Sequence, residues 1–367
     1  ESEMLQNFFE QVESADDLGF GVGWVAQAHL STETQKLNER PVVPHYPGEV
    51  GLCTDFFQFS REMLSRTKRM EVGSAVMSIL ASGGPIAQAE RVCALMALHG
   101  IDPEETRKIH IGFSAGRFEF MARPYGIVPR SSLEEAAWPV LRGKIFSEAS
   151  EIFLRLLNGE VISSDKISPT ILERDNFRTE EEWRLIQEKA VLEQDLGASP
   201  ESVEFSNRYL FEEIKTIPQD WNRELLNLVL GSHDKELQIS VNKFRPVQVF
   251  NLSITPPNII EETHQRMGEN YHPDGGMWER SMMPRTVMVF LNDEEGLDDE
   301  EQNEAAKEEA RSALSTYWNA LEGTIDPEKI NKATDNAVIG NVESVTRQIV
   351  ERFDSNDRLM CWFDFFN

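Results

Sequence analysis

Residues 70–100 read MEVGSAVMSILASGGPIAQAERVCALMALHG, and residues 109–127 read IHIGFSAGRFEFMARPYGI. The first stretch begins as an apolar strand, continues into a loop of small residues and predicts a helix from Pro85 to His99, because proline suits the first turn of a helix. The second stretch is another apolar strand that ends in small residues and arginines. Sites of parallel α/β enzymes lie where strands end and loops begin, so we expect the functional site here.

Strand-like and helix-like segments alternate along most of the chain. The expected strands cover residues 21–26, 70–79, 109–113, 247–254, 286–291, 336–339 and 359–365. Such alternation implies parallel strands joined by right-handed crossovers. Because no GxGxxG motif follows the first strand, we predict an eightfold β/α barrel and not an open dinucleotide-binding sheet. Only seven strands are found, and the sequence begins on a predicted helix and ends on a strand, so we expect a trimmed first strand and last helix.

Residues 158–240 interrupt the alternating pattern. They are polar, rich in glutamate and poor in clear strand signals. We expect a mainly helical insertion here, which covers the site or forms an interface. The rest of residues 1–367 is predicted to form a single domain, since 40% of the chain is hydrophobic and can build one large core.

Composition excludes several kinds of partner. The 36 basic and 63 acidic residues give a net charge of −27, which repels nucleic acids and anionic membrane surfaces. No apolar run approaches the roughly 18 residues of a membrane helix. Three widely spaced cysteines (Cys53, Cys93 and Cys361) fit a reducing compartment, so we expect a cytoplasmic protein. Neither a CxxC nor an HExxH spacing indicates a metal site.

Seven segments, in order along the chain, resemble those of one enzyme family. They are WVAQAHL (24–30), EVGSAVMSIL (71–80), GPIAQAERV (84–92), GFSAG (112–116) with Phe120, Arg123 and Gly126, FRPVQ (244–248), VIGNVESV (338–345) and LMCWF (359–363). Together they look like the bacterial luciferase-like, flavin-dependent monooxygenases. The resemblance implies a luciferase-like TIM barrel, with reduced FMN, or in some members the deazaflavin F420, at the carboxyl ends of the strands. It also implies a separate flavin reductase, a small organic substrate, O2 and a homo- or heterodimer.

The resemblance assigns a proton-moving role to the end of the second family strand. The catalytic histidine of the family is the first of a His-His pair, whose place is taken here by Ala28, and His29 matches the second. Gln27 stands where the family has an acid, so it can form hydrogen bonds to the flavin but cannot take a proton. An imidazole near the flavin can move protons near neutral pH. The alternative is a hydrogen-bonded structural histidine.

Three further residues match flavin contacts of the family. Ala75 and Val76 occupy the place of a non-prolyl cis peptide under the flavin ring, where small residues let the backbone approach. Ser114 matches a position beside the reactive edge of the flavin, where its hydroxyl can serve as a catalytic hydrogen-bonding group. An ordinary buried strand and a strand-end serine are the alternatives.

The resemblance also implies a phosphate site and a substrate pocket. Arg123, Ser253 and Thr255 are the expected phosphate ligands, helped by the free N–H groups of a helix that begins near residue 257. Surface salt bridges explain the arginine nearly as well. The apolar substrate pocket is expected at Trp278, Trp362 and Phe363, although aromatic residues at strand ends also form core. The remaining histidines are predicted to be structural or surface residues: His45, His99, His110, His233, His264 and His272.

The leading hypothesis is therefore a monooxygenase that uses reduced FMN. A deazaflavin-dependent oxidoreductase on the same barrel is the first alternative. The second alternative is a non-catalytic flavin-binding partner subunit, which Ala28 in place of the family histidine suggests.

Overall fold

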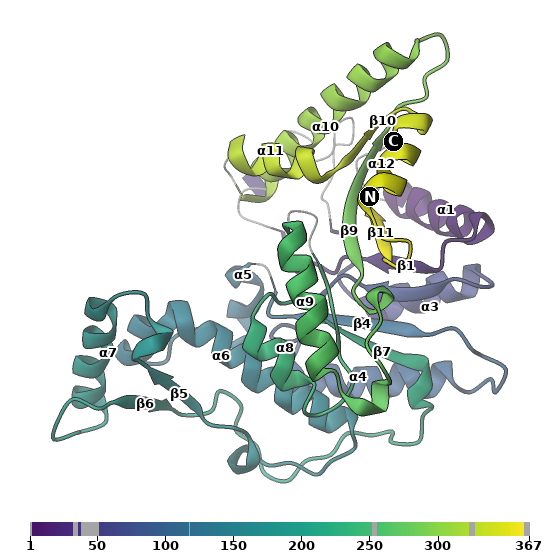
Figure 1. The fold of residues 1–367 in the computed structure, drawn as a ribbon. Helices are drawn as coiled ribbons and strands as arrows, with labels where there is room; N and C mark the ends of the chain where they lie inside the picture. Colours follow the sequence, from purple (N-terminus) through teal and green to yellow (C-terminus); the bar gives the residue numbers. More distant parts are fainter. Residues whose placement is uncertain are drawn as a thin grey trace.

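The computed structural model describes residues 2–31, 36–37, 51–116, 118–251, 255–322 and 327–362. Parallel strands form the centre of the molecule, and helices surround them (Figure 1). The parallel strands are β1 (Val22–Val25), β2 (Glu71–Ser74), β3 (Met77–Ser78), β4 (Ile109–Ser114), β7 (Leu226–Leu230), β8 (Gln248–Val249), β9 (Arg285–Leu291), β10 (Val338–Gly340) and β11 (Leu359–Trp362). The helices that follow or precede them are α1 (Ser2–Leu18), α3 (Phe56–Arg66), α4 (Gly84–His99), α5 (Glu119–Ala122), α6 (Ser132–Leu157), α8 (Lys235–Val241), α9 (Pro257–Asn270), α10 (Asp299–Glu322), α11 (Pro327–Asn336) and α12 (Val342–Arg352).

The strands form two sheets that are linked by a single bridge. The first sheet has the order β1-β2-β4-β7-β8, with β3 also paired to β4. A parallel bridge between Asn251 and Arg285 continues this order to β9, which pairs with both β10 and β11. Among the described residues, no pairing joins β11 to β1. Every predicted strand corresponds to an observed one, and the helix predicted from Pro85 to His99 is α4.

Strand β7 is the main departure from the expected order. It lies between β4 and β8, so it belongs to the central sheet, although the sequence around it predicted part of a helical insertion. The segment that leaves the sheet is therefore shorter than 158–240 and of mixed structure. It contains helix α7 (Glu180–Glu193) and an antiparallel pair, β5 (Thr170–Glu173) with β6 (Ser202–Phe205), which project from the body of the molecule (Figure 1).

Large rings fill the space enclosed by the first sheet. Trp24 of β1 lies 5.1 Å from the ring of Phe250 and 5.2 Å from the ring of His110, measured between centroids. Gly73 makes room for the indole, since a Cβ atom there would lie 2.3 Å from Trp24. His110 is fully buried, and its Nε2 lies 2.7 Å from Glu71. These contacts between β1, β2, β4 and the end of β8 define the inner face of the sheet.

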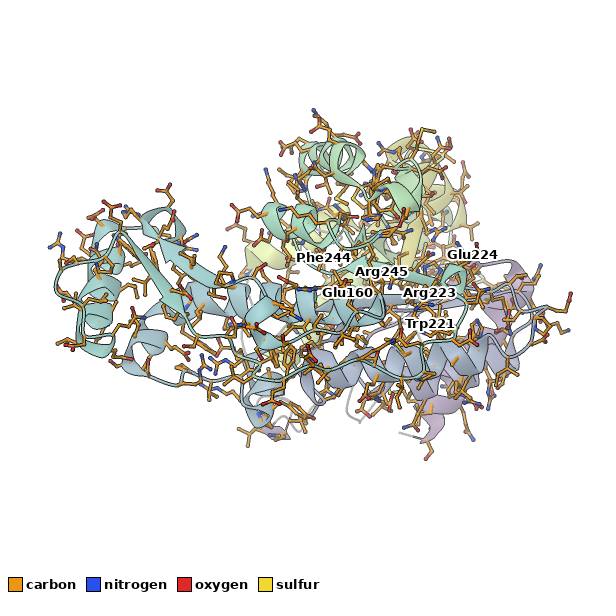
Figure 2. The ribbon with its side chains drawn as sticks, turned by 90° about the horizontal axis from the view of Figure 1, so that it is seen from below. Glu160, Trp221, Arg223, Glu224, Phe244 and Arg245 are labelled. Atoms are coloured by element: carbon orange, nitrogen blue, oxygen red, sulfur yellow. The ribbon has the colours of Figure 1, made fainter. Side chains whose placement is uncertain are left out.

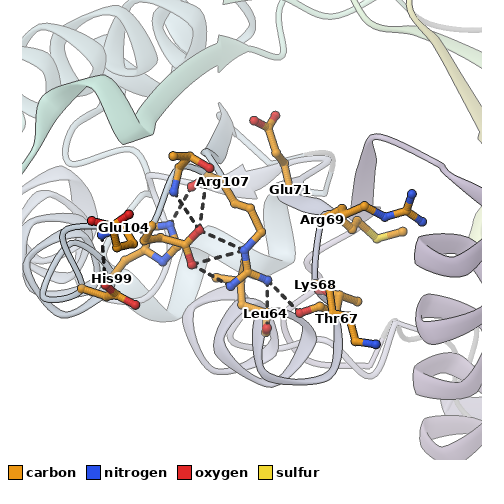
Figure 3. Close-up of polar contacts among 12 residues, drawn as sticks. Leu64, Thr67, Lys68, Arg69, Glu71, His99, Glu104 and Arg107 are labelled. Carbon is orange, nitrogen blue, oxygen red and sulfur yellow. Dashed lines mark hydrogen bonds and ion pairs between the residues drawn. The ribbon is translucent and has the colours of Figure 1, made fainter.

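Arginine side chains fix the loops at the amino-terminal ends of the strands. Arg107, just before β4, donates to the carbonyl oxygens of Leu64 and Thr67 and forms an ion pair with Glu105 at 2.6 Å (Figure 3). The hydrogen bond from the Arg107 side chain lowers the pKa of Glu105 to about 2. The loop before β4 is thereby tied to the end of α3.

A second group of cationic side chains lies at the same ends of β7 and β8. Arg223 stands 4.5 Å over the ring of Trp221, and Arg245 lies beside them (Figure 2). Burial, and then the charge of Arg223, lower the pKa of Arg245 to about 10. Its Nε and Nη1 atoms are buried without a hydrogen-bond partner among the described residues. The stacking of Arg223 on Trp221 gives this group a packing role.

Candidate functional site

A histidine and two neutral polar side chains meet at the carboxyl end of β1. Gln27 and His29 follow this strand, and Ser82 lies in the loop between β3 and α4. Gln27 Nε2 is 3.0 Å from His29 Nε2 and also donates a hydrogen bond to the carbonyl of Thr54 at 3.2 Å. Ser82 Oγ is 3.3 Å from His29 Nδ1. Segments far apart in the sequence therefore surround His29, which is only 6% exposed.

The amide of Gln27 determines where the proton of a neutral His29 ring lies. Its nitrogen faces the Thr54 carbonyl, so this atom is the NH2 group and acts as a donor toward His29 Nε2 as well. His29 Nε2 is then an acceptor, and the ring proton lies on Nδ1; Ser82 Oγ lies 3.3 Å from Nδ1 and 3.4 Å from Nε2. Gln27 Oε1 is buried and accepts no hydrogen bond from the described residues. It is an acceptor that a ligand N–H or O–H group can use.

Electrostatics keep this imidazole neutral. Burial lowers the pKa of His29 below its ordinary value of 6.5, and the positive charge of Arg91 lowers it further, against the opposing charge of Asp55. Arg91 and Asp55 form an ion pair at 2.5 Å, and Asp55 also caps α3 by accepting from the N–H of Phe57. A neutral imidazole, with a lone pair on Nε2 and an N–H group at Nδ1, can take up or release a proton.

Small residues line the neighbouring strand ends. The Ala75–Val76 peptide bond, between β2 and β3, is cis, as the family resemblance implied. A Cβ atom placed on Gly231 would lie 3.1 Å from Val76 and 3.3 Å from Ser114. The ends of β2, β4 and β7 therefore meet here with little side-chain bulk. Ser114 Oγ accepts a hydrogen bond from the N–H of Gly116 at 3.0 Å and keeps its own proton for another partner.

The end of β7 contributes residues that the sequence analysis did not select. Gly231, Ser232 and His233 follow this strand directly, and Asp234 caps α8 by accepting from the N–H of Leu237. Burial lowers the pKa of His233, which had been predicted to be structural or on the surface. The sequence does contain a pattern that predicts this strand-to-helix turn: an apolar run, then a glycine, then an aspartate that can cap a helix.

The proposed phosphate ligands do not come together. Arg123 lies in the short 3-10 helix after α5, is exposed, and has no side-chain hydrogen bond or ion pair within the described ranges. Thr255 lines a cavity with Arg285 and Arg352, and none of the strand-end residues above belongs to that lining. Ser253 lies outside the described residues. Because β7 and not β8 adjoins β4, Thr255 is also one strand further from Ser114 than expected.

The two described aromatic residues of the predicted substrate pocket pack against different helices. Trp278 precedes β9, donates to His264 Nδ1 at 3.1 Å and packs against Tyr271, so it lies with α9 and not at a strand end. Trp362 ends β11 and stands at 5.7 Å, edge to face, against Tyr317 of α10. Phe363 lies outside the described residues.

The strand-end group fits an aromatic cofactor better than a metal. It offers an unpartnered acceptor on Gln27, a neutral imidazole, a serine hydroxyl and glycine backbone that a flat ring can approach. Among the described side chains, no cluster of three or more His, Cys, Asp or Glu is arranged to hold a metal ion. In the same ranges, every helix is too short or too polar to cross a membrane.

No protein-family model and no curated protein matches this sequence. Several solved structures resemble it over nearly its whole length. The monooxygenase RslO1 from Streptomyces bottropensis is 15% identical, with 94% of this chain and 81% of RslO1 covered and a TM-score of 0.59. This chain shares the fold of that monooxygenase. The oxygenating constituent of 3,6-diketocamphane monooxygenase from Pseudomonas putida, in complex with FMN, is 13% identical (97% and 85% covered, TM-score 0.52). An F420-dependent secondary alcohol dehydrogenase with an F420-acetone adduct is 12% identical (96% and 87% covered, TM-score 0.52).

Proposed function

We propose that this protein is a flavin-dependent monooxygenase, which uses reduced FMN and O2 to oxidise a small organic substrate. The observation that carries the proposal is the group at the end of β1: a neutral, buried His29 held between Gln27 and Ser82, with Gln27 Oε1 free to accept a hydrogen bond. The chain that carries this group shares its fold with the monooxygenase RslO1 and with a monooxygenase component that was solved in complex with FMN. Reduced flavin, when bound, supplies the electrons for oxygen activation.

The side chains of the chain itself position ligands and manage protons. Gln27 accepts a hydrogen bond from the bound ring or substrate. His29 takes a proton at Nε2 or releases one from Nδ1, and the Ser82 hydroxyl lies beside both nitrogens. Ser114 donates its hydroxyl hydrogen toward the same space. Val76, with Ala75, forms the flat support beneath it, and burial of the group excludes water.

The remaining predicted contacts are part of the same proposal. Arg123 is the preferred phosphate ligand, because its guanidinium is exposed and uncommitted near the end of β4. Ser253 and Thr255 are weaker candidates, since Thr255 lines a different cavity. Trp362 and Phe363 are proposed to line the substrate pocket from the end of β11. We further propose a cytoplasmic homo- or heterodimer that receives reduced flavin from a separate reductase.

A deazaflavin-dependent oxidoreductase is the second candidate. It is supported by the F420-dependent alcohol dehydrogenase, which shares the fold to the same degree as the FMN complex. A catalytically inactive partner subunit is the third, because Ala28 replaces the family histidine.

Anaerobic titration of the full chain with FMN, reduced FMN and F420 tests these candidates. We expect reduced FMN to bind most tightly, and oxygen uptake to follow when a flavin reductase and candidate substrates are added. Preference for F420 would establish the second candidate, and flavin binding without turnover on any substrate the third. Failure to bind either cofactor would reject the whole proposal.

A further inference from the structure

Tyr209 belongs to the segment that returns from the projecting β5, α7 and β6 to strand β7 (Figure 1). Buried polar contacts fix this part of the segment to the body of the molecule. Glu148 of α6 is 4% exposed and accepts hydrogen bonds from the backbone N–H groups of Arg208 and Tyr209, both at 3.0 Å. Arg208 also forms an ion pair with Glu134 at 2.8 Å, and both side chains are buried. These contacts hold the backbone of Tyr209 in one place against α6.

The ring of Tyr209 packs on the first residue of α4. A Cβ atom placed on Gly84 would lie 3.1 Å from the ring of Tyr209 and 3.8 Å from its hydroxyl oxygen. Gly84 is two residues after Ser82, whose Oγ lies 3.3 Å from His29 Nδ1. A side chain from the returning segment therefore reaches the loop that contributes Ser82 to the group around His29.

Gln88 brings a second polar group to the same place. It lies one turn after Gly84 on the same face of α4, and it is fully buried. Its Nε2 atom donates to the carbonyl oxygen of Ala81 at 3.4 Å, so the side chain runs back along the helix, past Gly84, on which Tyr209 packs. Because the NH2 group faces Ala81, the acceptor Oε1 is left over. This atom is buried and has no hydrogen-bond partner among the described residues.

The hydroxyl of Tyr209 is the matching donor. Its oxygen is buried, and it forms no hydrogen bond within the part of the chain that the structure describes. Burial raises the pKa of Tyr209, and the charge of Glu148 raises it further, so the phenol keeps its proton at neutral pH. A buried donor or acceptor that is left unpaired costs free energy, and native proteins contain few of them. One of each beside the same helix face indicates a ligand group that both accepts and donates a hydrogen bond.

We propose that Tyr209 and Gln88 form a polar subsite that binds a hydroxyl group of the organic substrate. A hydroxyl accepts a hydrogen bond from Tyr209 Oη and donates its own hydrogen to Gln88 Oε1, so it satisfies both buried groups. A ketone, an ether or a carboxylate only accepts, and it would leave Gln88 Oε1 unpaired. The subsite therefore selects alcohols and phenols over these compounds. This inference rests on the proposed function, because it assigns a chemical class to the substrate of that same site.

Phenol and toluene are matched probes, because they differ only by a hydroxyl in place of a methyl group. NMR titration of the full chain measures the affinity of each probe without flavin, and FMN binding is measured in a separate titration. Phenol is expected to bind about tenfold more tightly than toluene, whereas an apolar pocket would favour toluene. FMN binding without a preference for phenol would overturn the subsite and leave the flavin proposal intact. A preference for phenol without FMN binding would reject the proposed function and, with it, the assignment of this hydroxyl to a substrate.

Two substitutions test the two members of the pair. Tyr209→Phe removes only the hydroxyl and keeps the ring against Gly84, so phenol should lose its advantage while toluene affinity and the melting temperature stay the same. Gln88→Met removes the acceptor at similar side-chain length and should also reduce the preference for phenol. Tyr271→Phe is the matched control, because Tyr271 is a half-buried tyrosine that packs against Trp278 and not against α4.

The variants also separate binding from a purely structural role. If Tyr209→Phe kept the full preference for phenol but melted at a lower temperature, the hydroxyl would be structural and the subsite would be overturned. Equal loss of the preference in Tyr271→Phe would overturn it as well, since the effect would then not depend on the contact with α4.

Discussion

The two ends of the parallel strands are built from different contacts. At the amino-terminal ends, ion pairs such as Arg107 with Glu105 and Arg280 with Asp357 fix the loops. At the carboxyl ends of β1, β2, β4 and β7, the strand-end groups themselves are neutral: an amide, an imidazole, a hydroxyl and glycine backbone. The ion pair of Arg91 with Asp55 acts on His29 from the neighbouring helices α4 and α3. The two members of an ion pair use their hydrogen-bonding groups on each other, so they fix the loops but offer little to a ligand. The neutral side chains at the carboxyl ends keep hydrogen-bonding groups that a ligand can use. This division agrees with the usual separation of stability and function in β/α barrels.

The largest effect is expected from His29→Ala. If the carboxyl ends carry the chemistry, loss of the imidazole lowers turnover by about 10²- to 10⁴-fold, the range for a general acid–base group. The melting temperature changes little by comparison. Steady-state kinetics and thermal unfolding measure the two quantities, with His272→Ala as the control outside the group. Turnover unchanged by His29→Ala would assign this residue a structural role only.

Arg107→Met tests the other end. The substitution removes two hydrogen bonds to carbonyls and leaves Glu105 unpaired, so the free energy of unfolding is expected to fall by about 2–4 kcal/mol. Chemical denaturation measures this loss. Turnover per folded molecule is expected to stay the same, and a fall in turnover without a loss of stability would contradict the comparison.

Acid should weaken the fold through the buried His110. Burial lowers the pKa of His110 below 6.5, although Glu71 acts against this shift. Between that lowered pKa and 6.5 the unfolded chain binds the extra proton, so stability falls as the pH drops through this window, by at most about 1.4 kcal/mol per pH unit. Denaturation between pH 7 and pH 5 measures the slope. His110→Gln should flatten it, and an unchanged slope would exclude His110 as its source.

The smallest effect is expected from an ion pair that belongs to neither end. Lys307 and Glu304 pair across one turn of α10 at 2.5 Å, but both side chains are about half exposed or more (47% and 66%). Water and salt screen such pairs, so Lys307→Met should change the melting temperature by no more than about 1 °C. If Lys307→Met lowered the stability as much as Arg107→Met, ion pairs would stabilise the fold wherever they lie, and not only at the amino-terminal ends of the strands.

Local pattern was sufficient to predict most strands and one part of the site. Each parallel strand except β7 appears in the sequence as an apolar run with turn residues beside it, whereas the antiparallel pair β5 and β6 lies in the segment that was expected to be helical. The strand-end positions of the parallel strands follow from those apolar runs. His29 and Ser114 were therefore placed at carboxyl ends before any contact was known. Strand β7 was not predicted, because its apolar run, LNLVL, lies inside a long polar stretch. The strand before Thr255 was therefore expected next to β4, although β7 lies between them.

The sequence by itself determined the alternation of strands and helices, the negative charge and the residue types at each strand end, since these depend on neighbours along the chain. Only the tertiary structure decided that Ser82 lies next to His29, that Gly231 lies beside Val76 and Ser114, and that Asn251 and Arg352 line one cavity. Such contacts join segments tens to about a hundred residues or more apart. Their geometry is set by strand order and by the packing of the whole sheet, which no local window of sequence contains.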